Sequence, residues 1–380
     1  MKIKLLVSSI VLSSLPIFAH SSVINSCGTV GGYDYPYIED INSQNMISVS
    51  TLAELEAALQ SGIENIYIPG DTTIELPYQS NALVIPDNVS LFSDRGRNGS
   101  AGALLKVDYI DEQPYNFPII QTGSNVHISG LRLQGPVEHI DTDVLTLGIQ
   151  TQENSSGLIV ENSELYGWGG GAISLKKAQN ARIHHNYIHL NQKRERGYGV
   201  VVQNGDASTA VYCNVFDSNR HSIAGSGKQG ESYTASNNII LQTGEGHSFD
   251  MHEDSDSTGD GGQAVNVINN WFAFGGTDWG HYPSVKLRGV PRDGLAGITG
   301  NIFRSPLEYQ DGGDRTKRAL EGVPGSMHSD PVLLELNQFN VDMTFSKTGE
   351  QCFLDYQDKS VPVLCQAVEK YISTGQTQPE

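Results

Sequence analysis

The sequence predicts an all-β solenoid, in which short strands wind into stacked coils. Six segments recur in which an asparagine precedes a short, mostly apolar run, and their asparagines are separated by 24, 28, 24, 32 and 31 residues. These are Asn162, Asn186, Asn214, Asn238, Asn270 and Asn301. Between them lie strand-sized runs rich in Val, Ile and Phe, split by Gly or Asn, without a helical period. A recurring spacing of this length indicates a repeat architecture.

The six asparagines are expected at the corners of the coils. Asparagine tolerates the left-handed backbone that a sharp corner requires, and its side chain can hydrogen-bond to the equivalent side chain of the next coil. We therefore expect one ladder of asparagines along the solenoid.

The first residues of the chain of 380 residues resemble a leader. Two lysines precede an apolar run over residues 5–19 that is too short to span a bilayer, and Ala19-His20-Ser21 offers a cleavage pattern. We expect residues 1–21 to be a secretory signal peptide and residues 22–47 an N-terminal extension. The mature chain is expected to be secreted, extracellular or periplasmic, with no membrane span.

A capping helix and the first coils follow. The segment STLAELEAALQSGIENIYIPGDTTIEL places Thr51 and Glu54 at capping-box spacing, and NVSLFSDRGRNGSAGALL and NVHISGLRLQGP follow it as coils. With the asparagine repeats, the chain resembles the right-handed parallel β-helix proteins of the pectate-lyase-like superfamily. The resemblance implies a right-handed parallel β-helix over residues 48–306, with a short N-terminal capping helix. The period fades after Ser305, so residues 307–380 are expected to form a C-terminal cap.

The same resemblance does not by itself fix an activity, because this fold hosts lyases, hydrolases, esterases and phage tailspikes. The pair NRHSIAGSG and HSFDMHE looks like secreted bacterial β-helix proteins that include lyases of biofilm matrix polysaccharides. The sequence departs from two familiar families of this fold. RGVPR differs in spacing from the arginine motif of pectate lyases. Asp250 is the only aspartate in the outward rows, whereas polygalacturonases carry several active-site aspartates.

Cysteine usage fits an oxidising compartment. An even count of four cysteines permits two disulfides there. The short spacing of Cys352 and Cys365 predicts a local clip in the C-terminal cap. Pairing of Cys213 with Cys27 and a buried free thiol at Cys213 are both open.

The net charge limits the classes of partner that the protein is expected to bind. The formal net charge is −19, which disfavours nucleic acid and anionic membranes. It leaves room for an acidic polysaccharide, because a local basic cleft can bind an anion on an acidic protein. We expect a monomer.

Side-chain alternation places a cluster of charged residues outside the solenoid. In HSFDMHE, residues 247–253, and in the strand stacked on it, the apolar positions face inward: Phe249, Met251, Val285 and Leu287. Asp250 is then expected beside Lys286, and His252 beside Arg288, on one outward face. His247 has inward parity and is expected to be a hydrogen-bonded edge residue.

These residue types suit β-elimination at a uronic acid. A base removes the C5 proton while cations stabilise the enolate-like carboxylate. His252 is the predicted base and Lys286 the alternative, while Asp250 positions one of them or binds a cation. Arg288 and Arg220 form the predicted carboxylate clamp. The expected substrate-binding residues are His221, Lys176, Gln203, Tyr198 and Arg292.

The sequence therefore predicts a secreted lyase that cleaves a uronate-containing polysaccharide. Three alternatives stay open: a glycoside hydrolase using Asp250 and a second carboxylate, a non-catalytic glycan-binding or matrix protein, and surface ion pairs without function. Because His252 and Arg288 are expected to face outward, replacing either is predicted to change stability by no more than about 1 kcal/mol.

A calcium loop is the one cofactor site that the sequence indicates. EDSDSTGDGG gives Asp254, Asp256, Thr258 and Asp260 the start of a calcium-loop pattern, but position 12 is Val265 rather than glutamate. An exposed acidic, glycine-rich loop is the alternative.

Overall fold

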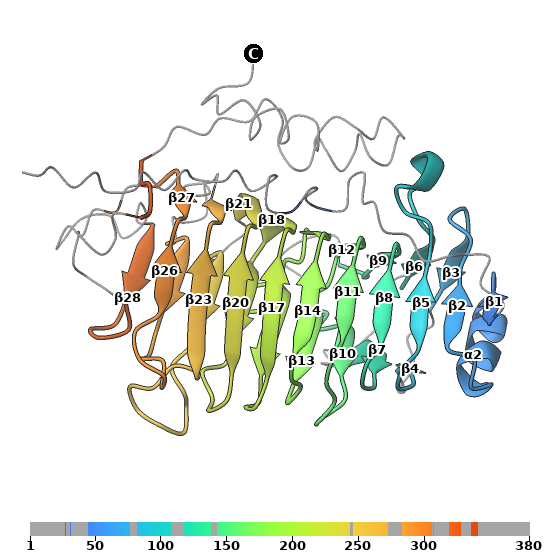
Figure 1. Ribbon diagram of the computed structural model, residues 1–380, viewed down its shortest axis with the longest axis horizontal. Coiled ribbons are helices and arrows are strands. Elements are labelled where there is room, and N and C mark those ends of the chain that lie inside the picture. Colours follow the sequence, from blue (N-terminus) through green and yellow to red (C-terminus); the bar gives the residue numbers. More distant parts are fainter. Residues whose placement is uncertain are drawn as a thin grey trace, which may run out of the picture.

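The computed structural model describes Cys27, Gly31 and residues 45–76, 82–107, 117–137, 143–243, 246–272, 283–305, 307, 319–327 and 336–340. Its strands form three parallel sheets of ten, nine and nine strands in these ranges. Each coil passes through the three sheets in turn, which we name A, B and C, and neighbouring coils stack in register (Figure 1). The predicted all-β parallel β-helix is confirmed.

Sheet A comprises β1 (Met46–Ser48), β2 (Asn65–Tyr67), β5 (Ser90–Phe92), β8 (His127–Ser129), β11 (Ile159–Glu161), β14 (Ala181–His184), β17 (Ser208–Tyr212), β20 (Ser232–Ser236), β23 (Ala264–Ile268) and β26 (Gly297–Thr299). Sheet B comprises β3 (Thr73–Glu75), β6 (Leu104–Lys106), β9 (Arg132–Gln134), β12 (Glu164–Tyr166), β15 (Tyr187–His189), β18 (Val215–Asn219), β21 (Ile239–Thr243), β24 (Trp271–Phe272) and β27 (Ile302–Phe303). Sheet C comprises β4 (Leu83–Ile85), β7 (Pro118–Thr122), β10 (Leu147–Thr151), β13 (Gly171–Lys176), β16 (Tyr198–Gln203), β19 (His221–Gly225), β22 (Phe249–Met251), β25 (Val285–Leu287) and β28 (Leu320–Gly322).

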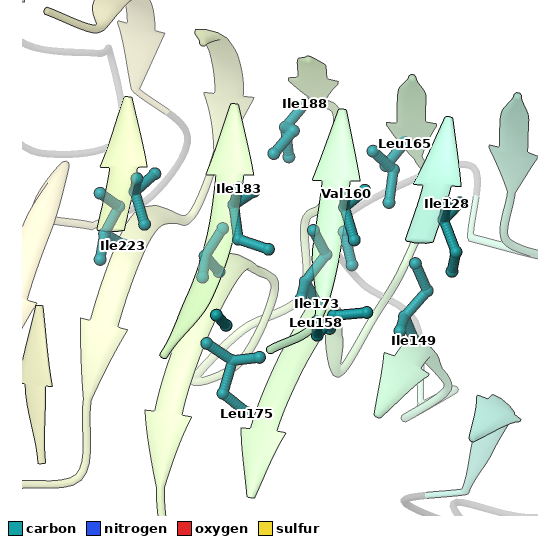
Figure 2. Close-up of a cluster of buried hydrophobic side chains, with 14 of the residues drawn as sticks. Ile128, Ile149, Leu158, Val160, Leu165, Ile173, Leu175, Ile183, Ile188 and Ile223 are labelled. Atoms are coloured by element: carbon teal, nitrogen blue, oxygen red, sulfur yellow. The ribbon is translucent and has the colours of Figure 1, made fainter. Parts of the chain in front are cut away.

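The core is the common interior of the three sheets. Ile149 and Ile173 from sheet C, Ile183 from sheet A and Ile188 from sheet B are all fully buried and converge on this interior (Figure 2). Alternating side chains supply one apolar row per sheet, so each coil buries its row against the rows of the coils above and below.

The predicted helix stands at the N-terminal end of the stack (Figure 1). It is α2 (Leu52–Gln60), and Thr51 and Glu54 form the capping box as predicted. Leu55, Ala58 and Leu59 are its buried residues, and α2 contacts β4. A short 3-10 helix, η1 (Arg97–Gly99), interrupts the second coil. No helix in the described ranges is long and apolar enough to cross a membrane.

The predicted asparagine ladder lies at the corner between sheets A and B, with two corrections. The side-chain amide nitrogens of Asn186, Asn214, Asn238, Asn270 and Asn301 donate to the next asparagine at 2.9–3.0 Å. The last acceptor is Asn337, which the sequence did not predict. At the other end Ser163 takes the ladder position, because its backbone nitrogen donates to Asn186 Oδ1.

At six corners the left-handed backbone belongs to the residue before the ladder position. Asn162, His185, Cys213, Asn237 and Asn269 have φ between 47° and 57°, and Gly300 has φ 70°. The ladder asparagines themselves are held by their hydrogen bonds. Asn162 was therefore assigned to the wrong row, since it occupies the left-handed position of its corner.

Replacing Asn238 by alanine should lower the free energy of unfolding by about 2–4 kcal/mol, because its loss leaves buried donors and acceptors of the ladder without partners. Asn238 is fully buried, donates to Val211 O and Asn270 Oδ1, and accepts from Asn214. Urea unfolding would measure the change. Asn266→Ala, at a half-buried position on β23, is the control and should cost less than about 1 kcal/mol. Equal losses in both variants would contradict a special role of the ladder.

The N-terminal segment is fastened to the β-helix. Cys27 and Cys213 form a disulfide, which excludes the free thiol at Cys213. Gly31 donates its backbone N–H to Cys213 O, and Arg95 donates to Gly31 O. The predicted leader at residues 1–21 and the predicted Cys352–Cys365 clip lie outside the described residues.

The strand stack extends beyond both predicted ends. It begins at β1, inside the predicted N-terminal extension, and β28 pairs with β25 after the predicted end at residue 306. The last repeat was missed because Asn301 and its partner Asn337 are 36 residues apart, longer than the earlier spacings.

Candidate functional site

Sheet C carries the predicted outward cluster, and its register is as predicted. Phe249 pairs with Val285, Asp250 with Lys286 and Met251 with Leu287. The four apolar residues of these pairs are buried in the core. Asp250 lies between Phe249 and Met251 on the strand and therefore points to the other side of sheet C.

Asp250 is nevertheless completely buried, because neighbouring polar side chains cover it. Arg288 binds it with two hydrogen bonds, from Nε to Oδ1 at 3.1 Å and from Nη2 to Oδ2 at 2.6 Å. His252 Nε2 lies 3.2 Å from Oδ2 and His221 Nε2 lies 3.6 Å from the same oxygen. One carboxylate thus fixes an arginine and faces two histidines.

Asp250 lies beside Lys286 in the register, as expected, but its carboxylate binds Arg288. Lys286 Nζ pairs instead with Glu321 Oε1 at 2.8 Å. Glu321 belongs to β28, which stacks on β25 and lies after the predicted end of the β-helix at residue 306. Arg288 is long enough to reach Asp250 diagonally on the neighbouring strand, and its planar fork suits the carboxylate better than an ammonium group does.

The buried carboxylate is ionised. Burial alone would raise the pKa of Asp250, but the hydrogen bonds from His252 and Arg288 outweigh it and hold the pKa well below its usual range. An ionised carboxylate only accepts hydrogen bonds. His252 therefore carries a proton on Nε2, and its Nδ1 has a free lone pair when the ring is neutral. The His252 side chain is 39% exposed.

The buried side chains of His221 and His247 form a row of stacked rings with the half-buried Tyr198. The rings of Tyr198 and His221 stack at 5.7 Å, and those of His221 and His247 also at 5.7 Å. Desolvation lowers the pKa of His221 to about 3 and that of His247 to about 2, so both rings are neutral at neutral pH. His221 Nδ1 donates to His247 O, which leaves the Nε2 lone pair facing Asp250.

The inward assignment of His247 is therefore wrong. His247 stacks on His221, which contacts the outward residue Asp250. Strict alternation fails next to it, where Ser248 O accepts hydrogen bonds from both Ser222 N and Ile223 N. This local irregularity brings the histidines to the same side of sheet C as Asp250.

The predicted substrate-binding residues are only partly brought together. His221 and Tyr198 belong to the cluster, and the charge of Arg220 acts on the His221 ring. Lys176 pairs with Glu153 at 3.0 Å, and Gln203 donates to Ser174 Oγ. They pair with each other in the register of β13 and β16, farther along sheet C.

Arg292 holds the predicted calcium loop instead of facing the cluster. Its Nη2 lies 2.6 Å from Asp254 Oδ2 and 3.4 Å from Asp260 Oδ2, while Nη1 donates to Gly227 O and Gly262 O. Asp256 pairs with Lys228 at 2.7 Å. Among the described residues, no group of three or more His, Cys, Asp or Glu side chains is arranged to hold a metal ion. A calcium role for Asp254, Asp256 and Asp260 stays a prediction.

Comparison with known proteins supports the fold. Residues 119–275 match the family described as "Right handed beta helix region", in agreement with the three parallel sheets of the described residues. No curated protein matches the sequence significantly. Two similar solved structures are an alginate lyase from Paenibacillus sp. str. FPU-7 and ORF18 of Geobacillus virus E2.

Both structural likenesses are remote. The alginate lyase is 13% identical, with a TM-score of 0.43 over 75% of this chain and 100% of the lyase chain. The viral protein is 11% identical, with a TM-score of 0.39 over 67% of this chain and 50% of its own. Neither carries an argument about activity, which must come from the residues of the site.

Proposed function

We propose that the protein is a secreted polysaccharide lyase that cleaves a uronate-containing glycan by β-elimination on the outer face of sheet C. The observation that carries the proposal is the fully buried Asp250, which binds the guanidinium of Arg288 and the imidazole of His252 while both keep an exposed edge. Fixing a base and a cation through one buried carboxylate is how a preorganised site is built.

The reaction needs a base, and His252 fits this role. Asp250 accepts from Nε2 and fixes the tautomer, so Nδ1 can take the C5 proton of a uronate. The electron pair of the C5–H bond then forms the C4–C5 double bond. The C4–O bond breaks, and the leaving oxygen takes a proton from solvent or from the imidazolium.

The developing negative charge on the uronate carboxylate needs cations. Asp250 occupies Nε and Nη2 of Arg288, which leaves Nη1 and the second N–H of Nη2 for a substrate carboxylate. Arg288 keeps 32% of its side chain exposed. Arg220 adds a second positive charge beside His221. Lys286, paired with Glu321, stays the alternative base.

The hydrolase alternative has less support from the geometry. A glycosidase needs one carboxyl group that protonates the leaving oxygen and a second that acts on the anomeric carbon. Asp250 has no exposed surface, and its pKa is held below the usual range. Glu253 accepts from Gly259 N in the neighbouring loop.

Secretion is supported by two features. The Cys27–Cys213 disulfide is typical of proteins from oxidising compartments, and the first residues carry a leader pattern. Detection of a mature chain beginning near residue 22 in the culture medium or periplasm would test it.

Replacing His252 by alanine should lower kcat about 10²–10⁴-fold, the contribution of a positioned base, and leave glycan affinity largely intact. The assay is absorbance of the unsaturated product from a panel of acidic polysaccharides, with new reducing ends counted in parallel. Lys228→Ala, an exposed neighbour that pairs with Asp256, is the control and should keep full activity.

Three outcomes would overturn the assignment. Reducing ends without the absorbance would support the hydrolase. Glycan affinity without cleavage across the panel would support a binding protein. Full activity of His252→Ala with loss in Lys286→Ala would move the base to Lys286.

A further inference from the structure

Three cations that pair with no acid of the described ranges gather at one edge of the site. The chain has 43 acidic and 24 basic residues, so acids are abundant. Lys176 and Lys177 share Glu153, and Lys228 pairs with Asp256. By contrast, no acid in the described ranges pairs with the cations Lys193, Arg196 and Arg220.

Lys193 and Arg196 belong to a tight turn. They form an antiparallel bridge, and Arg196 donates its backbone N–H to Lys193 O. Glu195 has φ 66° and Gly197 has φ 83°, which fixes the sharp reversal. Arg196 is exposed and Lys193 is half-buried, so the positive charge is presented to solvent.

The turn is fastened to the proposed active site. Tyr198 Oη donates to Glu195 O, and the Tyr198 ring stacks on His221. His221 also donates its backbone N–H to Gly197 O. Tyr198 lies on β16, two strands from Asp250 on β22.

The spacing suits a chain molecule. At about 4.8 Å per strand, the turn lies about 10 Å from Asp250 along the solenoid axis, and Arg220 lies between them, immediately before β19. A substrate laid along sheet C with one sugar at Asp250 would place a neighbouring sugar of the same chain at the turn. On a protein of net charge −19, a local cluster of cations focuses attraction for anions there.

We propose that the 193–196 turn and Arg220 bind the carboxylates of sugar units next to the cleaved one, which makes a polymer with charges on consecutive units the substrate class. This inference rests on the proposed function and extends the site from one sugar to a row of charged sugars. The turn sets affinity and the position of cleavage along the chain, while His252 performs the proton transfer.

The test removes the charges of Lys193 and Arg196, two of the three cations of the turn. Lys193→Asn/Arg196→Asn should raise KM for a fully charged polyuronate about tenfold, which is about 1.4 kcal/mol of binding, with kcat within about twofold. The salt dependence of KM should become shallower, because fewer charge contacts remain to be screened. With a polymer whose carboxyls are largely esterified, wild type and variant should have similar KM values.

The matched control is Lys177→Asn/Lys228→Asn, which removes two exposed cations that already pair with acids. It should leave KM and its salt dependence unchanged, and thermal melting of both double variants should stay close to wild type. Equal effects in the two double variants would show a general charge effect and overturn the inference. So would an unchanged KM in Lys193→Asn/Arg196→Asn.

Calorimetric titration with the polyuronate separates this inference from the proposed function. If wild type binds without cleaving and the turn variant binds more weakly, the proposed lyase activity is contradicted and the proposed binding site is supported. If wild type cleaves and the turn variant binds the polyuronate as tightly as wild type, only the proposed binding site is contradicted. Binding of duplex DNA or anionic vesicles through the turn, without polyuronate binding, would also overturn it.

Discussion

Asp250→Ala is expected to lower kcat about 10³–10⁴-fold, the scale produced by losing a carboxylate that orients a catalytic histidine. The carboxylate fixes the tautomer of His252 and holds Arg288 in its two-point geometry. The same substitution should destabilise the fold. Breaking a buried ion pair costs about 3–5 kcal/mol; because Arg288 keeps 32% exposure and water can replace part of the contact, we expect about 2–4 kcal/mol.

Asp250→Asn separates these two effects. The amide keeps the volume and one acceptor oxygen, so the loss of stability should be smaller than for alanine. Its nitrogen donates where Asp250 accepts, so His252 loses its fixed tautomer and activity should still fall strongly. Asp256→Ala, at an exposed surface pair with Lys228, should change stability by less than about 1 kcal/mol and leave activity intact. Wild-type activity of Asp250→Ala in a correctly folded protein would place the active site elsewhere.

The structure also changes what is expected at Arg288. Its outward position predicted a stability change of no more than about 1 kcal/mol. Because its guanidinium is the partner of a buried carboxylate, Arg288→Ala should cost more than that, since Asp250 would be left buried without its main counter-charge.

The fold was predictable because two periods are visible in the sequence. Alternation along each strand set Phe249 and Met251 inside and Asp250 outside, and the recurring asparagines set which strands stack. The capping helix was predictable from a local pattern, since Thr51 and Glu54 need only each other. Each of these features depends on residues near in sequence or repeated at a regular distance.

The errors lie where the period breaks. The shared position of His221 and His247 depends on a strand irregularity at Ser248, which has no local sequence signal. The pairing of Lys286 with Glu321 involves β28, which lies after the predicted end of the β-helix at residue 306. Arg288 reaches Asp250 diagonally on the neighbouring strand because its side chain is long. The strand register alone does not predict this contact. The Cys27–Cys213 disulfide joins residues 186 apart, and four cysteines left that pairing undetermined.

Acid should destabilise the protein because of the buried histidines of the site. His221 and His247 have pKa values lowered to about 3 and about 2 by burial, whereas an unfolded histidine titrates near 6.5. Between pH 6.5 and about 3 the unfolded chain binds protons at these positions that the folded chain does not. Stability therefore rises with pH in this window and is lost as pH falls through it, at about 1.4 kcal/mol per pH unit for each proton.

The charged groups near His221 and His247 affect stability in the same pH window or at lower pH. Arg288, Lys286 and Arg220 oppose protonation of the rings, while Asp250 favours it without preventing the net decrease. Asp250 itself has a lowered pKa, so its contribution is present above its unfolded pKa of about 3.9 and is lost only at more acidic pH. We expect His221 and His247 to account for about 2–5 kcal/mol of the stability lost between pH 6.5 and pH 4.5, the effect of one to two withheld protons; burial also lowers the pKa values of His184, His185 and His189, which add to the loss.

Urea unfolding between pH 7 and 4.5 would measure this slope in wild type and in His221→Gln. The variant removes one buried imidazole, so its slope should fall by about 1.4 kcal/mol per pH unit, whatever its stability at pH 7. Tyr198→Phe changes the ring stacked on His221 without removing an imidazole, and its slope should match wild type. An equal slope in wild type and His221→Gln would mean that His221 is protonated in the folded protein and forms an ion pair with Asp250. The base at His252 would then share its carboxylate with a second cation besides Arg288, and the site would carry more positive charge toward an anionic substrate.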